Sequence, residues 1–426
     1  MKRISILAFT IILLVGCTSD LQSPSSVITV TVQAGELTPT PKLSTWSVYD
    51  PDPDHLWNRV FRQLYRRVAA NGKEYGSDEL DPLLWQDTIY LLDGVSHEHT
   101  VQVLDEFLSA HAENLIREPL KRAMFQRDLW VVFDWLAGQA EPFPRQRQAL
   151  EARLAQMIKR VALSKEEILS LPDNYRLAVG SNTFPASVQV DHPEIAFLPA
   201  DIFQADSAWV PMGGEGGPIA LTHTEAFPFY GHSVFLVFLR SPSGRAATLD
   251  FLESLNTQPK PVTALGSDVA LVRRMLLIDE QGDLILSPLV ETVQIRHFSP
   301  AQSFHEFELS RARLFNGLAG GLVLKPDLFM LFMGHGDVFQ NPDIPELRAA
   351  IPDICKGCHS EYPPIFNSGN TQSILSYSRE KFPLADNEQA ILFPTTWAEE
   401  AQTVITWKLD HETWKSLKVL WDQAGP

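Results

Sequence analysis

The spacing of the apolar residues changes near Leu171, and this change limits the chain to a mixed α and β architecture. Before this point, apolar side chains recur every three to four residues, which is the period of one helix face. Runs with this spacing start near Asp54, Val103, Pro119 and Leu150. After it, short apolar or alternating runs are separated by turn residues, as in strands. The chain also contains 30 prolines, which excludes a single long helical bundle.

Helix start and stop signals support the prediction of helices before Leu171. Asp54 is placed to cap a helix that Gly72 would stop, and Pro119 suits the first turn of another. Ser164 and Glu167 have the spacing of a capping box. These signals predict several helices joined by short loops, which together form a small helical domain.

Strand signals dominate the stretch between residues 191 and 325. The polar run Asp279–Asp283 separates two apolar runs and predicts a hairpin loop. Gly213–Gly217 is not followed by the Lys and Ser or Thr of a phosphate loop, so it predicts a flexible turn. Five runs predict strands: 233–239, 269–278, 284–286, 292–298 and 304–309.

We therefore expect an α+β protein of several domains, with a helical domain, then a β-rich domain, then a mostly helical or irregular C-terminal segment. The 426 residues, 45% of them hydrophobic, can bury large cores. In the C-terminal segment, Glu346–Ala350 predicts one helical turn and Pro352 the first turn of a new helix. The expected segments are 1–16 (signal), 17–47 (tether), 48–175 (helical), 176–325 (β-rich) and 326–426 (C-terminal).

The first residues have the features of a secretion signal. Lys2 and Arg3 precede an apolar run at 4–15, which is too short to cross the roughly 30 Å of a bilayer as a helix. The tetrapeptide Leu14–Cys17 resembles the lipobox of bacterial lipoproteins. That resemblance implies that Cys17 is acylated, becomes the new N-terminus and anchors the protein to a lipid membrane. The alternative is an ordinary signal whose cleavage leaves a cysteine by chance.

The resemblance to lipoproteins also implies a location in the cell envelope, lipid-anchored and extracytoplasmic. If the host has two membranes, Thr18 in place of an Asp favours the periplasmic or outer-membrane side. Cleavage changes the formal charge from −17 to about −19. Such an acidic body argues against nucleic acid as a partner. Neutral or basic partners fit better.

Two of the three cysteines lie in Cys355-Lys356-Gly357-Cys358-His359. On a helix, positions i and i+3 share a face, so both thiols can reach one edge of a porphyrin. The five residues resemble the attachment motif of c-type cytochromes. The resemblance implies that Cys355 and Cys358 bind one haem c covalently and that His359 is the proximal iron ligand. One-electron transfer with an unknown redox partner protein is then the expected function.

The sixth ligand of the iron is not fixed by the motif. Small soluble cytochromes c take a methionine well downstream, but no methionine follows His359 in this chain. His335, between two glycines, is the first candidate for a distal ligand, and His411 and Met333 follow. Ordinary core packing is the competing interpretation for Met333. The ligand decides the redox role, since it shifts the reduction potential by several tenths of a volt.

Several other readings of the cysteine pair remain open. Cys355 and Cys358 could form a redox dithiol, with Phe393-Pro394-Thr395 supplying a nearby proline. They could bind zinc with two of the histidines 335, 359 and 411. They could form a plain disulfide in a haem-free binding or structural lipoprotein. A haem enzyme or sensor with an open sixth site is a further alternative, so the sequence leaves enzymatic activity undecided.

Two further histidine groups carry weaker signals. His97 and His99 flank Glu98 at the start of an expected helix, where a solvated end is a simpler interpretation than a metal site. His223 and His232 could line a pocket, although positions in a loop are the simpler expectation. The chain contains no nucleophile elbow, zincin motif or dinucleotide-binding glycine pattern.

Overall fold

The computed structural model describes most of the chain between residues 47 and 424. Residues 43–426 form one compact unit, and residues 1–42 belong to a separate unit that lies outside the described ranges. The expected boundaries near 175 and 325 fall inside this one unit. The described residues are 47–68, 72, 74–76, 88–138, 143–189, 191–192, 194–225, 231–257, 265–298, 303–324, 330–332, 348–350 and 391–424.

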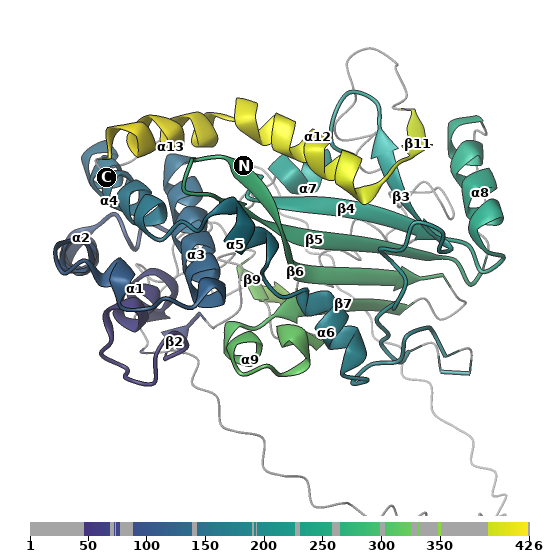
Figure 1. Cartoon of the computed structure of the whole chain (residues 1–426), viewed down its shortest axis with the longest axis horizontal. Helices are drawn as coiled ribbons and strands as arrows, with labels where there is room; N and C mark the ends of the chain where they lie inside the picture. Colours follow the sequence, from purple (N-terminus) through teal and green to yellow (C-terminus); the bar gives the residue numbers. More distant parts are fainter. Residues whose placement is uncertain are drawn as a thin grey trace, which may run out of the picture. The chain divides into compact units, whose positions relative to one another are not determined.

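The fold is mixed α+β, as expected, with helices gathered around one large antiparallel sheet (Figure 1). Within the described ranges, none of the helices combines the length and the hydropathy that crossing a membrane requires. The helices are α1 Leu56–Tyr65, α2 Gly94–Ser109, α3 Pro119–Ala137, α4 Pro144–Arg160, α5 Lys165–Leu169, α6 Asn174–Gly180, α7 Leu221–Glu225, α8 Arg245–Thr257, α9 Arg311–Phe315, α12 Trp397–Asp410 and α13 Glu412–Gln423.

The large sheet has seven strands in the order β11-β3-β4-β5-β6-β7-β8, and every neighbouring pair is antiparallel. Two short strand pairs, β1 with β2 and β9 with β10, lie outside it. The strands are β1 Arg67–Val68, β2 Glu74–Tyr75, β3 Trp209–Gly214, β4 Ser233–Arg240, β5 Asp268–Ile278, β6 Leu284–His297, β7 Ser303–Leu309, β8 Leu322–Leu324, β9 Met330–Phe332, β10 Arg348–Ala350 and β11 Leu392–Pro394.

The helix signals before Leu171 correspond to real helices, although both ends of the first helix differ from the expectation. Pro119 occupies the first turn of α3, and Ser164 with Glu167 forms both bonds of a capping box on α5. The cap of α1 was expected at Asp54 but is His55, whose side chain accepts from the backbone N–H of Trp57. This helix ends at Tyr65, because the chain then turns into strand β1.

The strand predictions are confirmed for β4, β5 and β7, whereas three details differ. The runs at 284–286 and 292–298 belong to one long strand, β6. Gly213 was expected in a turn but pairs with Phe393 at the sheet edge, where a Cβ atom would lie 2.7 Å from the Phe393 ring. The helical turn expected at Glu346–Ala350 is also wrong, because Arg348–Ala350 is strand β10.

One hydrophobic core joins the helices to one face of the sheet, and we call this the core face. Leu236, Val272, Val293 and Phe307 contribute to it from four successive strands. A smaller core lies on the opposite face, which we call the outer face, where α8 covers β3 and β4. Its buried members are Val210, Met212, Leu239, Leu252, Leu255 and Leu392.

The C-terminal residues return to the body of the protein. Strand β11 forms one edge of the sheet next to β3, and α12 packs against β4. Helix α13 continues along α4 (Figure 1). Here the Lys159 ammonium donates to the backbone carbonyls of Trp421 and Ala424, at 3.0 and 2.6 Å. The described residues 391–424 are therefore part of the same fold as the sheet.

Candidate functional site

Most of the residues predicted to bind haem or lipid lie outside the described ranges. They are Cys17, Met333, His335, Cys355, Cys358 and His359. The described backbone brackets the haem motif, since β10 ends at Ala350 and β11 begins at Leu392. The roles of these six residues stay predictions.

His411 is the one predicted iron ligand that the structure describes, and it lies between α12 and α13. Its Nδ1 accepts from the backbone N–H of Thr413 at 3.3 Å, so the ring caps α13. The ring packs on Trp407 with 4.9 Å between centroids. Capping through the Nδ1 lone pair places the ring proton on Nε2. A ligand that binds iron through Nε2 needs the opposite tautomer, with the proton on Nδ1.

The other histidines singled out in the sequence serve packing and hydrogen bonding. His97 lies in the first turn of α2, and its Nδ1 is 3.1 Å from the carbonyl oxygen of Leu91. His223 on α7 stacks on Phe235 with 5.7 Å between ring centroids. Over the described part of the chain, no three His, Cys, Asp or Glu side chains are grouped so that they could hold a metal ion.

The densest group of charges is one that the sequence did not reveal, and we call it the buried ionic cluster. Its members come from α3, β5, β6, α12 and the residue before β4, and the exposed fraction of each is 0–1%. The members are Arg127, Asp134, His232, Arg273, Glu291 and Lys408.

Glu291 is the centre of one half of the cluster. The Arg127 Nε donates to its Oε1 at 2.6 Å, and the Arg273 Nε lies 3.2 Å from its Oε2. The Ser233 hydroxyl also donates to Oε2. Burial alone would raise the pKa of Glu291, but Arg127 and Arg273 outweigh it and lower the pKa to about 2. This carboxylate is therefore charged.

Asp134 is the centre of the other half. The Lys408 ammonium donates to its Oδ2 at 2.8 Å and to the Thr413 hydroxyl at 2.9 Å. The His232 Nδ1 lies 3.6 Å from the same Oδ2. Burial would raise the pKa of Asp134, but Lys408 and His232 lower it. Burial lowers the pKa of His232 to about 4 against the effect of Asp134, so this ring is neutral at pH 7.

The two halves meet where the Arg127 Nη2 lies 3.4 Å from the His232 Nε2. The cluster thereby connects helix α3 with the central strands and with α12. Because its members are almost fully buried, a dissolved substrate cannot reach them. We therefore assign the cluster a structural role: through Lys408 it holds helix α12 against α3 and the sheet.

A second buried ion pair fixes the start of the described chain. The Arg311 Nε donates to Asp128 at 2.9 and 3.0 Å, and the Tyr49 hydroxyl donates to the same carboxylate. The guanidinium of Arg311 lies over the rings of Phe61 and Tyr65, at 4.9 and 5.0 Å from their centroids. Burial, with Asp128 second, raises the pKa of Tyr49 well above its usual value. This pair joins α3, α9 and the segment before α1.

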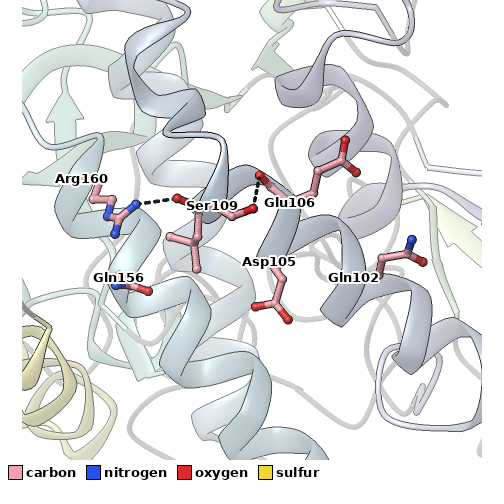
Figure 2. A pocket seen from close by; sticks show the side chains of 7 residues that line it. Gln102, Asp105, Glu106, Ser109, Gln156 and Arg160 are labelled. Atoms are coloured by element: carbon pink, nitrogen blue, oxygen red, sulfur yellow. Dashed lines mark hydrogen bonds between the residues drawn. The ribbon is translucent and has the colours of Figure 1, made fainter.

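An open groove of about 720 Å³ lies between α2 and α4 (Figure 2). Its charged residues are already engaged: Asp105 pairs with Arg153 at 2.7 Å, and Glu106 pairs with Arg59 at 2.6 Å. Arg160 donates to the backbone carbonyl of Leu108 at 2.9 Å, as the dashed line in Figure 2 shows. These charged side chains make contacts with one another's helices and neighbours, and the contacts do not converge on one ligand position.

Glu400 provides a pH-dependent prediction. It lies on α12, is 3% exposed, and accepts from the backbone N–H of Ile219 at 2.7 Å. Burial raises its pKa to about 7, against the Ile219 N–H, which lowers it. The folded state then binds this proton more tightly than the unfolded state, so stability falls as the pH rises from about 4.5 to about 7. We expect Glu400→Gln to reduce the loss in Tm between pH 5 and pH 8.

The measurement is thermal unfolding of both proteins at the two pH values. Asp410→Asn is the matched control, because its carboxylate lies at the other end of α12 and is 88% exposed. The control should show the same difference in Tm as the wild type. If Tm falls as much between pH 5 and pH 8 in Glu400→Gln as in the wild type, the raised pKa of Glu400 is contradicted.

Comparisons of the chain with protein-family models, with curated proteins and with solved structures found no match to any of them.

Proposed function

We propose that the chain is a membrane-anchored extracytoplasmic lipoprotein that binds one covalent haem c and transfers single electrons. The observation that carries the proposal is Cys355-Lys356-Gly357-Cys358-His359 in a chain whose remaining cysteine, Cys17, ends a lipobox. A helical part and a β-rich part precede the haem-bearing segment. An unknown redox protein is the partner, and the formal charge of −17 argues against nucleic acid.

The donor set fits a c-type haem. Two thiols three positions apart match the two vinyl groups on one porphyrin edge, and an imidazole at the next position is a nitrogen ligand that haem iron accepts. When bound, the haem supplies a one-electron couple. In this proposal Cys355 and Cys358 hold the group by thioether bonds, and His359 binds the iron on the proximal side.

The ligand on the distal side of the iron decides between electron transfer and the other haem functions. His335 and Met333 remain the upstream candidates. His411 serves as a distal ligand only if its ring gives up the Nδ1 cap on α13, which costs about 1 kcal/mol for an N-cap of ordinary strength. This cost makes His411 the less favoured ligand of the three. An open sixth site would instead indicate a haem enzyme or a sensor.

An optical spectrum of the mature wild-type protein tests the proposal. We expect sharp low-spin bands in the reduced protein that carbon monoxide does not change, because both axial positions of an electron-transfer haem are filled. A five-coordinate spectrum that shifts with carbon monoxide would indicate the enzyme or sensor. A colourless protein would mean that the cysteine pair is a disulfide, a dithiol or a zinc site.

Membrane anchoring gives a separate prediction. Cys17→Ser removes the only thiol of the lipobox, so we expect the variant to leave the membrane fraction and appear in the soluble fraction. The measurement is fractionation followed by immunodetection. Thr18→Ser is the matched control and should remain with the membranes. Unchanged fractionation of Cys17→Ser would contradict the lipoprotein assignment, without bearing on the haem.

A further inference from the structure

Two consecutive arginines on β5 lie where its pairing with β6 is irregular. The register of the two strands shifts between Arg273 and Arg274, and again between Arg274 and Leu276. A bulge of this kind redirects the side chains beside it. Arg273 joins the buried ionic cluster, where its Nε lies 3.2 Å from the Glu291 carboxylate. Arg274 does not join the cluster and contacts two aromatic rings instead.

The Arg274 guanidinium lies in a corner that the rings of Phe203 and Trp397 form. Its Cζ is 4.7 Å from the centroid of the Trp397 ring and 5.5 Å from that of the Phe203 ring. The two ring centroids are 6.4 Å apart, and the ring planes are inclined at 78° to each other. Cation–π attraction to both rings fixes the position of the guanidinium. All three side chains belong to half-buried residues, so none of them is sealed in the core.

Most of the hydrogen-bonding capacity of Arg274 is unused. A guanidinium carries several N–H donors, and within the described residues one of them is engaged, since Nη2 donates to the Ser287 carbonyl at 3.0 Å. The Nε atom is buried and has no hydrogen-bond partner. Burial lowers the pKa of Arg274 to about 10, against the effect of Asp173, whose carboxylate caps α6 and accepts from the Arg176 N–H. The side chain is therefore charged at pH 7 but has no carboxylate bound to it in the described part of the chain.

Comparison with two other arginines shows what Arg274 lacks. Arg311 pairs with the Asp128 carboxylate. Arg122 has no such pair within 4 Å in the described residues, but it donates to four backbone carbonyls at 2.7–3.5 Å. A cation that is partly removed from water needs an anion or several carbonyls as partners. Arg274 has a single carbonyl, so its remaining donors can accept an anion from outside the described fold.

The geometry points to Arg274 as a binding site for the carboxylate group of a small organic anion. The free N–H groups of a guanidinium can hold both oxygens of a carboxylate in a fork. The rings of Phe203 and Trp397 hold the guanidinium in place and reduce its contact with water, which strengthens the attraction. A singly charged carboxylate suits the site better than a phosphate, because Asp173 and the net charge of −17 repel a second negative charge. The site goes beyond the proposed function and does not involve the haem.

Fluorine NMR of para-fluorobenzoate with the purified mature protein tests this site. We expect the wild type to broaden the fluorine line of this carboxylate. Acetate should reverse the broadening, whereas chloride at the same ionic strength should not. The matched probe is para-fluorobenzamide, which has the same ring without the charge, and its line should stay sharp. Equal broadening of both probes, or displacement by phosphate at a lower concentration than by acetate, would overturn the assignment.

Arg274→Met removes the charge and keeps a long apolar stem beside the rings. We expect this variant to lose the broadening and to unfold at the same Tm as the wild type or a higher one, because it removes a charge that has no carboxylate partner. Arg122→Met is the matched control. It should lower Tm, since four carbonyls lose their donor, and should still broaden the line. Broadening by Arg274→Met at the wild-type level, or a Tm as low as that of Arg122→Met, would show that Arg274 has only a structural role.

Arg274→Lys tests the forked contact separately from the charge. Lysine keeps the positive charge but presents a single ammonium, so we expect para-fluorobenzoate to bind about tenfold more weakly than to the wild type. Equal affinity in this variant and the wild type would contradict a carboxylate held by two N–H groups. The same titration in the background Cys355→Ala/Cys358→Ala should give the wild-type affinity. Loss of binding there would show that the probe binds at the haem and not at Arg274.

Discussion

The double variant Cys355→Ala/Cys358→Ala is expected to lose all covalently bound haem, whereas each single variant keeps haem through the remaining thioether. The reason is that one thioether survives denaturation as well as two, while iron–imidazole coordination does not. Haem staining of a denaturing gel and the intact mass of each purified protein measure the result. Staining of the double variant at the wild-type level would refute the attachment site.

His359→Ala is the control that distinguishes attachment from ligation. This variant keeps both thiols, so its haem should remain on the denatured chain while the optical spectrum changes. The cysteines lie between β10 and β11 in the chain, outside the described residues. Far-ultraviolet circular dichroism of all four variants checks that any loss of haem is not caused by loss of the fold.

Glu291→Ala is expected to reduce the free energy of unfolding by about 3–5 kcal/mol. The substitution leaves Arg127 and Arg273 buried without the carboxylate that they share. Burying a charge without its partner is far more costly than losing a pair in water. Chemical denaturation followed by circular dichroism measures the loss.

Glu106→Ala is the matched control for this prediction. Its Oε2 lies 2.6 Å from the Arg59 Nη2, the same distance as between Arg127 and Glu291, but the two side chains are 42% and 30% exposed. Solvent screening then limits the effect to less than about 1 kcal/mol. Equal losses in the two variants would show that burial does not set the energetics of the ionic cluster. Glu291→Gln should lie between them, because the amide keeps an acceptor for Arg127.

Local signals in the sequence were sufficient for helices α1 to α5 and for the central strands, but not for α6 to α9, α12 and α13. Pro119 and the Ser164–Glu167 box act within one turn of chain, so their effect does not depend on distant residues. The alternation in β7 and the loop at Asp279–Asp283 are local as well. The strand at Gly213 could not be predicted in this way, because its pairing partner Phe393 is 180 residues away.

The buried ionic cluster shows why the rest could not be predicted. Lys408 and Asp134 are separated by 274 positions, and each alone resembles an ordinary surface charge. His232 was expected in a loop, and it does lie at a bend before β4, but the sequence did not show that it is fully buried. The one signal available was the presence of Arg127 and Asp134 on a helix that is apolar on most sides. The candidate haem site is the opposite case. Cys355, Cys358 and His359 lie within five consecutive residues, so the sequence alone is enough to predict their chemistry.

The return of the last strand and helices to the body has a consequence for biogenesis. If the chain is exported N-terminus first, as the proposed function requires, residues 355–359 leave the membrane before β11, α12 and α13 do. At that stage the sheet lacks one edge, and Asp134 lacks Lys408. Under the proposed function, enzymes that join haem to the two thiols would then meet a polypeptide whose folding is still incomplete.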